Sequence, residues 1–157
     1  MRIISKSPDE TLYIGRDIAR NLKPSDIICL FGELGSGKTV LAKGIGLGLG
    51  VRAGEINSPS FVLLRQYNEG RVPLYHFDLY RLKGPRDIMS LGYEEYLYGD
   101  GITVIEWPDR LKYLMPKECL KVRLFISGNK QRRLEFSANG QRYQELLGSL
   151  HNIDGDS

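Results

Sequence analysis

The spacing of apolar residues along the chain alternates between a helical and an extended period, and each change predicts a different element. Apolar side chains recur every three or four positions over 12–22, which predicts a helix with one apolar face. The preceding Ser-Pro-Asp-Glu at 7–10 is a capping box with proline at the first helical position. By contrast, the Ile-Ile-Cys-Leu-Phe run at 27–31 predicts a buried strand. The same reasoning predicts strands at 3–4, 61–67, 72–78, 102–105, 120–126 and 133–137, and helices from residue 40 onward, over 85–98 with an interruption at Gly92, over 109–114 and over 141–150.

A glycine-rich loop separates strand 27–31 from the helix that follows it. Its sequence, Gly-Glu-Leu-Gly-Ser-Gly-Lys-Thr, matches the phosphate-binding pattern G-x-x-x-x-G-K-[ST]. The glycines let backbone N–H groups point inward at an anion, and the helix N-terminus adds its positive dipole. We expect Lys38 to reach the β- and γ-phosphates of a nucleotide and the Thr39 hydroxyl to bind Mg²⁺. The predicted nucleotide-binding residues of this loop are Gly32, Glu33, Leu34, Gly35, Ser36, Gly37, Lys38 and Thr39.

The helix after the loop contains an unusual run of glycines. Positions 44, 46, 48 and 50 are all glycine. Each costs a helix up to about 1 kcal/mol relative to alanine. We therefore expect this helix to fray before Gly50.

The predicted strands suggest an α/β fold with a mixed sheet flanked by helices. Residues 61–67 and 72–78 surround a short turn and read as a hairpin, and 120–126 with 133–137 form a second one. Antiparallel hairpins beside a P-loop strand exclude a purely parallel doubly wound sheet.

Composition and length limit the class of protein. With 41% hydrophobic and 26% charged residues the chain resembles ordinary soluble proteins. Its 157 residues predict a single P-loop ATPase domain over 1–150 and a disordered tail over 151–157. No apolar stretch is long enough to span a bilayer and no signal peptide is recognisable, so the expected location is the cytoplasm.

The net charge of +3 is too small to indicate nucleic-acid binding. Cys29 and Cys119 lack metal-site spacing and are expected to be reduced packing residues.

Two acidic residues follow predicted strands and are candidates for the metal chemistry that a P-loop needs. Asp78 ends the strand at 75–77 and Glu106 ends the strand at 102–105, so both are expected at the edge of the sheet beside the phosphates. Either one alone is equally well explained as a helix cap or a solvated loop charge, whereas the two together favour Mg²⁺. We expect Lys38, Asp78 and Glu106 to be the catalytic residues and Thr39, Asp78 and Glu106 to bind the metal. His76 shares a strand face with Asp78 and either orients that carboxylate or the water shell of the metal, or simply satisfies a backbone carbonyl.

Three further residues are candidates for a nucleotide-dependent switch or lid. Ser58 and Ser60 bracket a proline ahead of strand 61–67, where a hydroxyl can sense the γ-phosphate, although serine-proline turns need no such role. Trp107 directly follows Glu106 and fits either a lid over the site or the core.

The second hairpin has one polar face, on which Lys121 and Arg123 of one strand meet Arg133 of the other. Lys130 and Arg132 lie nearby in the sequence. A solvated surface is the simpler interpretation of this face. The alternative is a docking surface for RNA phosphates or for an acidic partner.

Four motifs together resemble the TsaE family of bacterial P-loop ATPases, which assist the formation of threonylcarbamoyladenosine on tRNA. They are GELGSGKT at 32–39, NSPSF at 57–61, YHFDLYRL at 75–82 and EWP at 106–108, in the order and spacing of that family. The similarity extends from the capped first helix to the last hairpin. Two positions depart from the family: Ser60 replaces a threonine, and the glycines at 44–50 replace better helix formers.

The resemblance implies a P-loop NTPase-like three-layer fold with a seven-stranded mixed sheet. It also implies Mg²⁺ held by Thr39, Asp78 and Glu106, with ATP as the substrate and Glu10 near the nucleotide base. Residues 57–61 and Trp107 are then mobile with nucleotide state. The implied partners are the two other proteins of the threonylcarbamoyl transferase complex, of TsaB and TsaD type, with tRNA reached through that complex and no membrane involved.

The leading functional hypothesis is an ATPase that supports this tRNA modification, with slow hydrolysis until its partners complete the site. A small-molecule kinase also needs a P-loop, Mg²⁺ and a carboxylate, but the chain shows no arginine-rich lid. The third hypothesis is a nucleotide-sensing module with little turnover, whose output is the switch loop.

Overall fold

A seven-stranded mixed sheet forms the centre of the structure, a computed structural model that describes residues 1–52, 54–56 and 63–150. The strand order is β1-β7-β6-β2-β5-β4-β3. The strands are β1 (Arg2–Ser5), β2 (Ile27–Phe31), β3 (Leu64–Tyr67), β4 (Leu74–Asp78), β5 (Ile102–Glu106), β6 (Cys119–Ile126) and β7 (Arg132–Asn139). The helices are α1 (Pro8–Ala19), α2 (Lys38–Leu49), α3 (Pro85–Met89), α4 (Tyr93–Leu97), the 3₁₀ helix η1 (Pro108–Leu114) and α5 (Gln141–Ser149).

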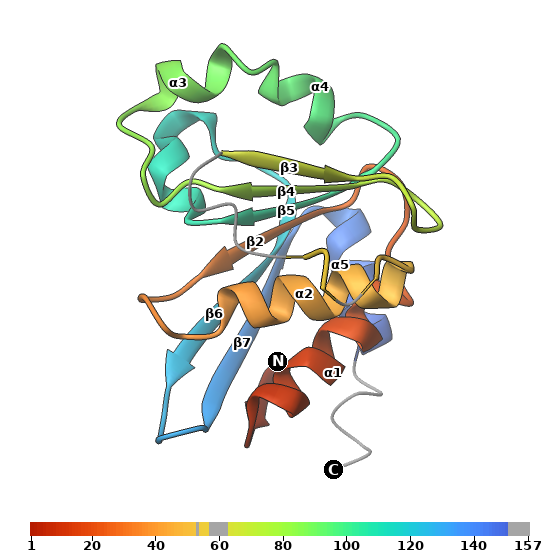
Figure 1. Cartoon of the computed structure of the whole chain (residues 1–157), viewed down its shortest axis with the longest axis vertical. Coiled ribbons are helices and arrows are strands. Elements are labelled where there is room, and N and C mark those ends of the chain that lie inside the picture. Colours follow the sequence, from red (N-terminus) through yellow and green to blue (C-terminus); the bar gives the residue numbers. More distant parts are fainter. Residues whose placement is uncertain (53, 57–62, 151–157) are drawn as a thin grey trace.

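The helices cover both sides of the sheet (Figure 1). Helices α1 and α2 lie together on one side, and α3 and α4 lie on the other. The predicted α/β fold with a mixed sheet flanked by helices is therefore confirmed, including the seven strands that the family resemblance implies. No helix among the described residues is long and apolar enough to cross a membrane.

The central strands are parallel, and this arrangement places the candidate site residues at one edge. Strand β2 pairs in parallel with β5 and with β6, and β4 pairs in parallel with β5. The carboxyl ends of these strands therefore lie at the same edge, where ligands bind in open α/β sheets. The glycine loop follows β2, Asp78 ends β4 and Glu106 ends β5. The antiparallel pairs are β3 with β4, β6 with β7 and β1 with β7.

Most predicted elements agree with the structure. Both hairpins are present, and the predicted helix over 85–98 is divided by Gly92, whose φ is +70°. Cys29 and Cys119 are buried free thiols, as expected. The helix expected over 109–114 is instead a 3₁₀ helix with a kink at Lys112, where φ is +51°. The first helix ends at Ala19, ahead of the predicted end at Leu22.

The expected fraying of the P-loop helix is wrong. Helix α2 continues to Leu49, and Gly50 caps it in the left-handed conformation with φ +100°. The glycines within the helix permit close contact with neighbouring elements. A Cβ on Gly48 would lie 2.8 Å from the Arg16 carbonyl oxygen of α1, and a Cβ on Gly44 would collide with the carbonyl oxygen of Leu12. Tertiary packing of α1 against α2 thus offsets the low helix propensity of these glycines.

This packing predicts that Gly44→Ala destabilises the protein by about 2–3 kcal/mol, because the new methyl group meets rigid backbone atoms of α1. Gly148 of α5 is the matched control, since a Cβ there meets no atom within 4 Å. Gly148→Ala should raise the free energy of unfolding by about 0.5–1 kcal/mol, because alanine favours the helix. Urea unfolding of the two variants measures both effects. A Gly44→Ala protein as stable as the wild type would contradict the proposed close packing.

Candidate functional site

The loop at 32–39 adopts a curled conformation that its glycines make possible. Gly35 and Gly37 have φ of +82° and +103°, values that L-residues with side chains rarely adopt. Gly32 has a different constraint, because a Cβ there would lie 2.8 Å from the carbonyl oxygen of Leu124 in β6. Helix α2 begins immediately after Gly37, so its N-terminus faces the loop. This is the geometry that binds phosphate through backbone N–H groups and the helix dipole.

Lys38, the first residue of α2, directs its ammonium group back into the loop. Its Nζ donates hydrogen bonds to the carbonyl oxygens of Gly32 at 2.5 Å and Glu33 at 2.9 Å. The same Nζ lies 4.1 Å from the centre of the Trp107 ring. Burial lowers the pKa of the Lys38 ammonium, and the nearby carboxylates of Glu106 and Asp78 oppose this shift. The structure thus places a buried cation in the centre of the loop.

Glu106 links the loop to the neighbouring strands through a chain of three buried or half-buried side chains. The Thr39 hydroxyl donates to Glu106 Oε1 at 2.9 Å, and His76 Nε2 lies 2.5 Å from Glu106 Oε2. His76 and Glu106 are only 1% and 2% exposed. Thr39 belongs to α2, Glu106 to β5 and His76 to β4, so three elements position this carboxylate.

The structure corrects the sequence interpretation of His76. Its Nε2 pairs with Glu106 of the adjacent strand, a partner that neither the Asp78 nor the backbone-carbonyl interpretation named. A role of His76 toward the water shell of a metal stays a prediction. The parallel pairing of β4 with β5 brings the two side chains together, and the spacing within one strand gives no sign of it. His76 Nδ1 is buried without a hydrogen-bond partner among the described residues.

Asp78 lies at the same edge, directly opposite Glu106 in the register of β4 and β5. It is half-buried, and its Oδ1 accepts a hydrogen bond from the backbone N–H of Tyr80 at 3.1 Å. The described residues contain no group of three or more His, Cys, Asp or Glu side chains that could hold a metal ion by themselves. The oxygens near the loop include those of Thr39, Glu106 and Asp78. Hard oxygen ligands of this kind suit Mg²⁺, which takes only one or two carboxylates and completes its shell with phosphate and water.

Trp107 contacts the glycine loop through Lys38. Its backbone φ is +60°, an uncommon value for a residue of this size, and its ring packs against Tyr80 with a centroid distance of 5.0 Å. The ring also lies over the Lys38 ammonium. These contacts place Trp107 beside Lys38, and its role as a lid that moves with nucleotide stays a prediction. The predicted switch residues Ser58 and Ser60 lie outside the described residues.

Glu10 lies in the first turn of α1, beside the loop. Its backbone N–H donates to the Ser7 hydroxyl at 3.1 Å, which is the N-cap bond of the predicted capping box. The reciprocal bond differs from that motif, because Glu10 Oε2 accepts at 2.6 Å from the backbone N–H of Lys6, one residue before the N-cap. The next residue, Thr11, places its methyl carbon 4.0 Å from where a Cβ on Gly37 would lie. The start of α1 thus borders the nucleotide loop, and contact of Glu10 with the base stays a prediction.

Sequence reasoning missed the contribution of the β6–β7 hairpin to the loop. Arg132 Nη2 donates to the carbonyl oxygen of Gly35 at 3.2 Å, and Nη1 donates to Gly128 and Gln131 oxygens in the hairpin turn. From the sequence, Arg132 is placed only near the polar face of the hairpin, without a contact to the loop. Arg132 is two residues before the buried Leu134 on the same strand, so the two share a face, and Arg133 points to the opposite one. That signal was available in the sequence.

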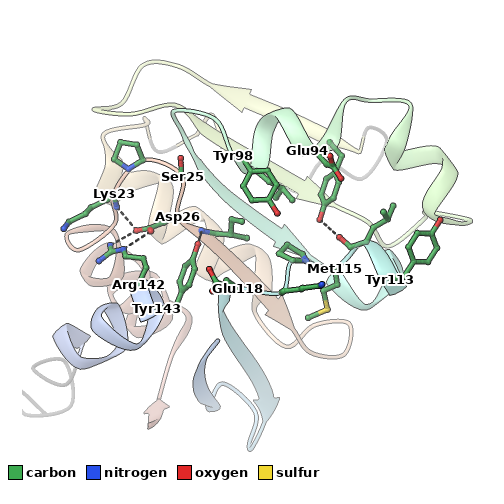
Figure 2. A pocket seen from close by; sticks show the side chains of 17 residues that line it. Lys23, Ser25, Asp26, Glu94, Tyr98, Tyr113, Met115, Glu118, Arg142 and Tyr143 are labelled. Carbon is green, nitrogen blue, oxygen red and sulfur yellow. Dashed lines mark hydrogen bonds and ion pairs between the residues drawn. The ribbon is translucent and has the colours of Figure 1, made fainter. Parts of the chain in front are cut away.

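A separate cavity of about 800 Å³ lies at the other edge of the sheet, where β2 and β6 begin (Figure 2). Its wall is formed by residues 23–27, α4, residues 113–118 and the first turn of α5. Asp26 accepts two hydrogen bonds from Arg142 at 2.9 and 2.7 Å, and Tyr143 accepts one from the backbone N–H of Ile27. The predicted nucleotide and metal residues do not line this cavity.

Comparison with known proteins gives one consistent family. The family model described as "Threonylcarbamoyl adenosine biosynthesis protein TsaE" matches residues 5–134. The "tRNA threonylcarbamoyladenosine biosynthesis protein TsaE" of Bacillus subtilis is 37% identical over 151 residues, which cover 96% of this chain and 94% of that protein. The protein of the same name from Treponema pallidum is 39% identical over 133 residues, covering 83% and 97%. The crystal structure of Bacillus subtilis YdiB superposes with a TM-score of 0.85 and 33% identity, covering 98% of this chain and 95% of that one.

Proposed function

The chain belongs to the TsaE family of threonylcarbamoyl adenosine biosynthesis proteins, and we propose that it is a cytoplasmic ATPase of that pathway. In this proposal it binds and hydrolyses ATP with Mg²⁺ and thereby supports the complex that forms threonylcarbamoyladenosine on tRNA. The observation that carries the proposal is the convergence of Lys38, Thr39 and Glu106 at the carboxyl edge of the sheet. P-loop NTPases use a lysine, a hydroxyl and an acidic residue in this way.

The residues of the loop would bind and orient the nucleotide. Backbone N–H groups of the curled segment and of the first turn of α2 face the phosphates, and Lys38 neutralises charge between the β- and γ-groups. In the structure the Lys38 ammonium bonds to carbonyl oxygens of the loop itself, so it is held within reach. Trp107 covers this cation and restricts the access of water to it.

The oxygens of Thr39, Asp78 and Glu106 fit Mg²⁺, whose chemistry is to neutralise the charge that develops on the phosphate oxygens. The hydrogen bond between Thr39 and Glu106 holds both oxygens in one orientation. His76 fixes the second oxygen of the same carboxylate from the core side. Glu106 therefore either holds the metal, directly or through water, or orients the attacking water.

Asp78→Asn is expected to retain the nucleotide and to weaken Mg²⁺ by about tenfold or more, because a neutral amide is a poorer ligand for a hard cation. Asparagine can still accept the hydrogen bond from the Tyr80 backbone, so the turn should be preserved. The measurement is ATP affinity and hydrolysis over a Mg²⁺ titration. Asp87→Asn, an exposed carboxylate of α3, is the matched control. An identical Mg²⁺ dependence of Asp78→Asn and wild-type protein would remove Asp78 from the metal site.

The experiment that tests the function is phosphate release from ATP by the protein alone, with purified TsaB-type and TsaD-type proteins, and with candidate small-molecule acceptors. We expect slow release alone and faster release with the two partner proteins. Transfer of phosphate to an acceptor would indicate a kinase. Tight ATP binding without release under any condition would indicate a nucleotide-sensing module.

A further inference from the structure

One face of the sheet, formed by β1, β7 and β6, lies opposite α1 and α2 and is left partly exposed. The buried Leu120, Val122 and Leu124 of β6 point to the helix side, because the Leu124 side chain lies 3.6 Å from where a Cβ on Gly37 would be. The alternate residues of β6 therefore point away from these helices. The strand register places Phe125, Arg133 and Ile4 in one row and Arg123, Glu135 and Arg2 in the next. We call these six residues the open sheet face.

The open sheet face has a strong excess of positive charge. It contains three arginines and one glutamate, and Lys121 lies two residues before Arg123 on the same side of β6. Arg2 and Arg133 each lie 3.2 Å from Glu135, so this carboxylate is already compensated. Arg123 and Lys121 make no ion pair within the part of the chain that the structure describes. Two cations are therefore available to an outside acceptor.

The two central guanidinium groups are held in place by aromatic rings. The Arg123 guanidinium lies 4.3 Å from the centre of the Phe31 ring, and that of Arg133 lies 4.4 Å from the centre of the Phe125 ring. Both contacts lie within the range of a cation–π interaction, which restricts the side chains. A guanidinium that is ordered beforehand loses less conformational entropy when it binds a carboxylate.

The apolar part of this face favours a protein over a nucleic acid. Ile4 is 43% exposed on the edge strand β1 and lies in register with Arg133, and the half-buried Phe125 lies on the other side of Arg133. Exposed apolar and aromatic side chains interleaved with arginines are the composition of a protein interface. A polyphosphate chain gains nothing from Ile4, because its contacts are electrostatic.

The open sheet face also adjoins the nucleotide loop. Phe31, under the Arg123 guanidinium, is the residue directly before Gly32. The carbonyl oxygen of Leu124, next to Arg123 in β6, touches Gly32 closely enough to exclude a Cβ there. Arg123 contacts Phe31, and Phe31 directly precedes the loop. A partner bound to Arg123 would therefore lie close to the loop.

We propose that the open sheet face docks a partner protein that presents carboxylates next to an apolar side chain, and that this docking acts on the adjacent loop. The proposal rests on the proposed function in one respect, the choice of the TsaB-type and TsaD-type proteins as candidate partners. The test measures their binding to the wild-type protein and to the triple variant Lys121→Ala, Arg123→Ala, Arg133→Ala over about 50–500 mM salt, a range that shortens the Debye length from about 14 Å to about 4 Å and so brackets the physiological value of about 8 Å.

We expect the triple variant to bind one partner about 30-fold more weakly at low salt, with a flatter salt dependence. Ile4→Ser should weaken binding at every salt concentration, because it removes apolar contact and no charge. The control triple variant Arg20→Ala, Lys83→Ala, Arg86→Ala removes the same charge from exposed positions elsewhere and should bind normally. ATP affinity measured without partners should stay within about twofold in all variants, which separates this face from the nucleotide site.

Equal binding of the wild-type protein and the first triple variant would overturn the proposal while leaving the ATPase function intact. A loss confined to binding of an in vitro transcribed tRNA would also overturn it and assign the face to RNA. If the wild-type protein binds neither partner, both the proposed complex and this docking face fail. Loss of partner-stimulated phosphate release in the triple variant, with unchanged release by the protein alone, would support the coupling to the loop.

Discussion

Lys38→Ala is expected to reduce ATP affinity by at least about 100-fold and to abolish turnover, because the charge-assisted hydrogen bonds from Lys38 to the phosphates are among the strongest in the site. Lys38 is buried in the curve of the loop, and its ammonium already points at the loop oxygens. Another cation cannot easily replace it, because Arg132, which also contacts the loop, is engaged with the hairpin turn and the Gly35 carbonyl.

The measurement is isothermal titration with ATP and Mg²⁺, together with steady-state phosphate release. Lys43→Ala is the matched control, since Lys43 lies on the same helix but outside the loop and should leave both quantities unchanged. Thermal unfolding of both variants shows whether the fold is retained. Wild-type ATP affinity and turnover in Lys38→Ala would contradict the P-loop assignment.

Glu106→Gln is expected to keep the fold and to lower turnover by about 10²- to 10⁴-fold, because glutamine preserves size but cannot accept a proton or carry negative charge. Glutamine can still accept from the Thr39 hydroxyl, and its amide N–H can donate to His76 Nε2 when the ring proton is on Nδ1. The buried chain of side chains therefore has a neutral replacement, and loss of activity is not expected to come from unfolding.

A Mg²⁺ titration of nucleotide affinity, run beside single-turnover hydrolysis, separates the two roles of Glu106. Unchanged Mg²⁺ affinity with lost hydrolysis indicates that the carboxylate orients the attacking water. A parallel loss of both indicates a metal ligand. Glu95→Gln on α4, an exposed carboxylate, is the control. Hydrolysis at the wild-type rate in Glu106→Gln would exclude this residue from the site.

Local sequence patterns were sufficient to locate the glycine-rich loop at 32–39 and most elements of the fold. The helix N-cap at Ser7, the glycine pattern at 32–39 and the alternation in the second hairpin each depend on neighbours a few residues apart. The structure has these features where the sequence predicted them. Asp78 and Glu106 were also predictable as residues at strand ends, since each directly follows a buried apolar run.

The contacts between these features were not predictable, because they depend on the order of strands in the sheet. His76 meets Glu106 only because β4 and β5 are neighbours, and Glu106 meets Thr39 only because β5 lies beside β2. Local helix propensity predicted that the glycines of α2 weaken the helix, whereas in the structure Gly44 and Gly48 are the points where α1 packs closely against it. The sequence alone thus determined which segments form the glycine loop, the strands and the helices, because these choices depend on backbone preference and on local apolar spacing. Tertiary structure decided which side chains meet, because long-range packing of the apolar faces selects the strand order and the helix contacts.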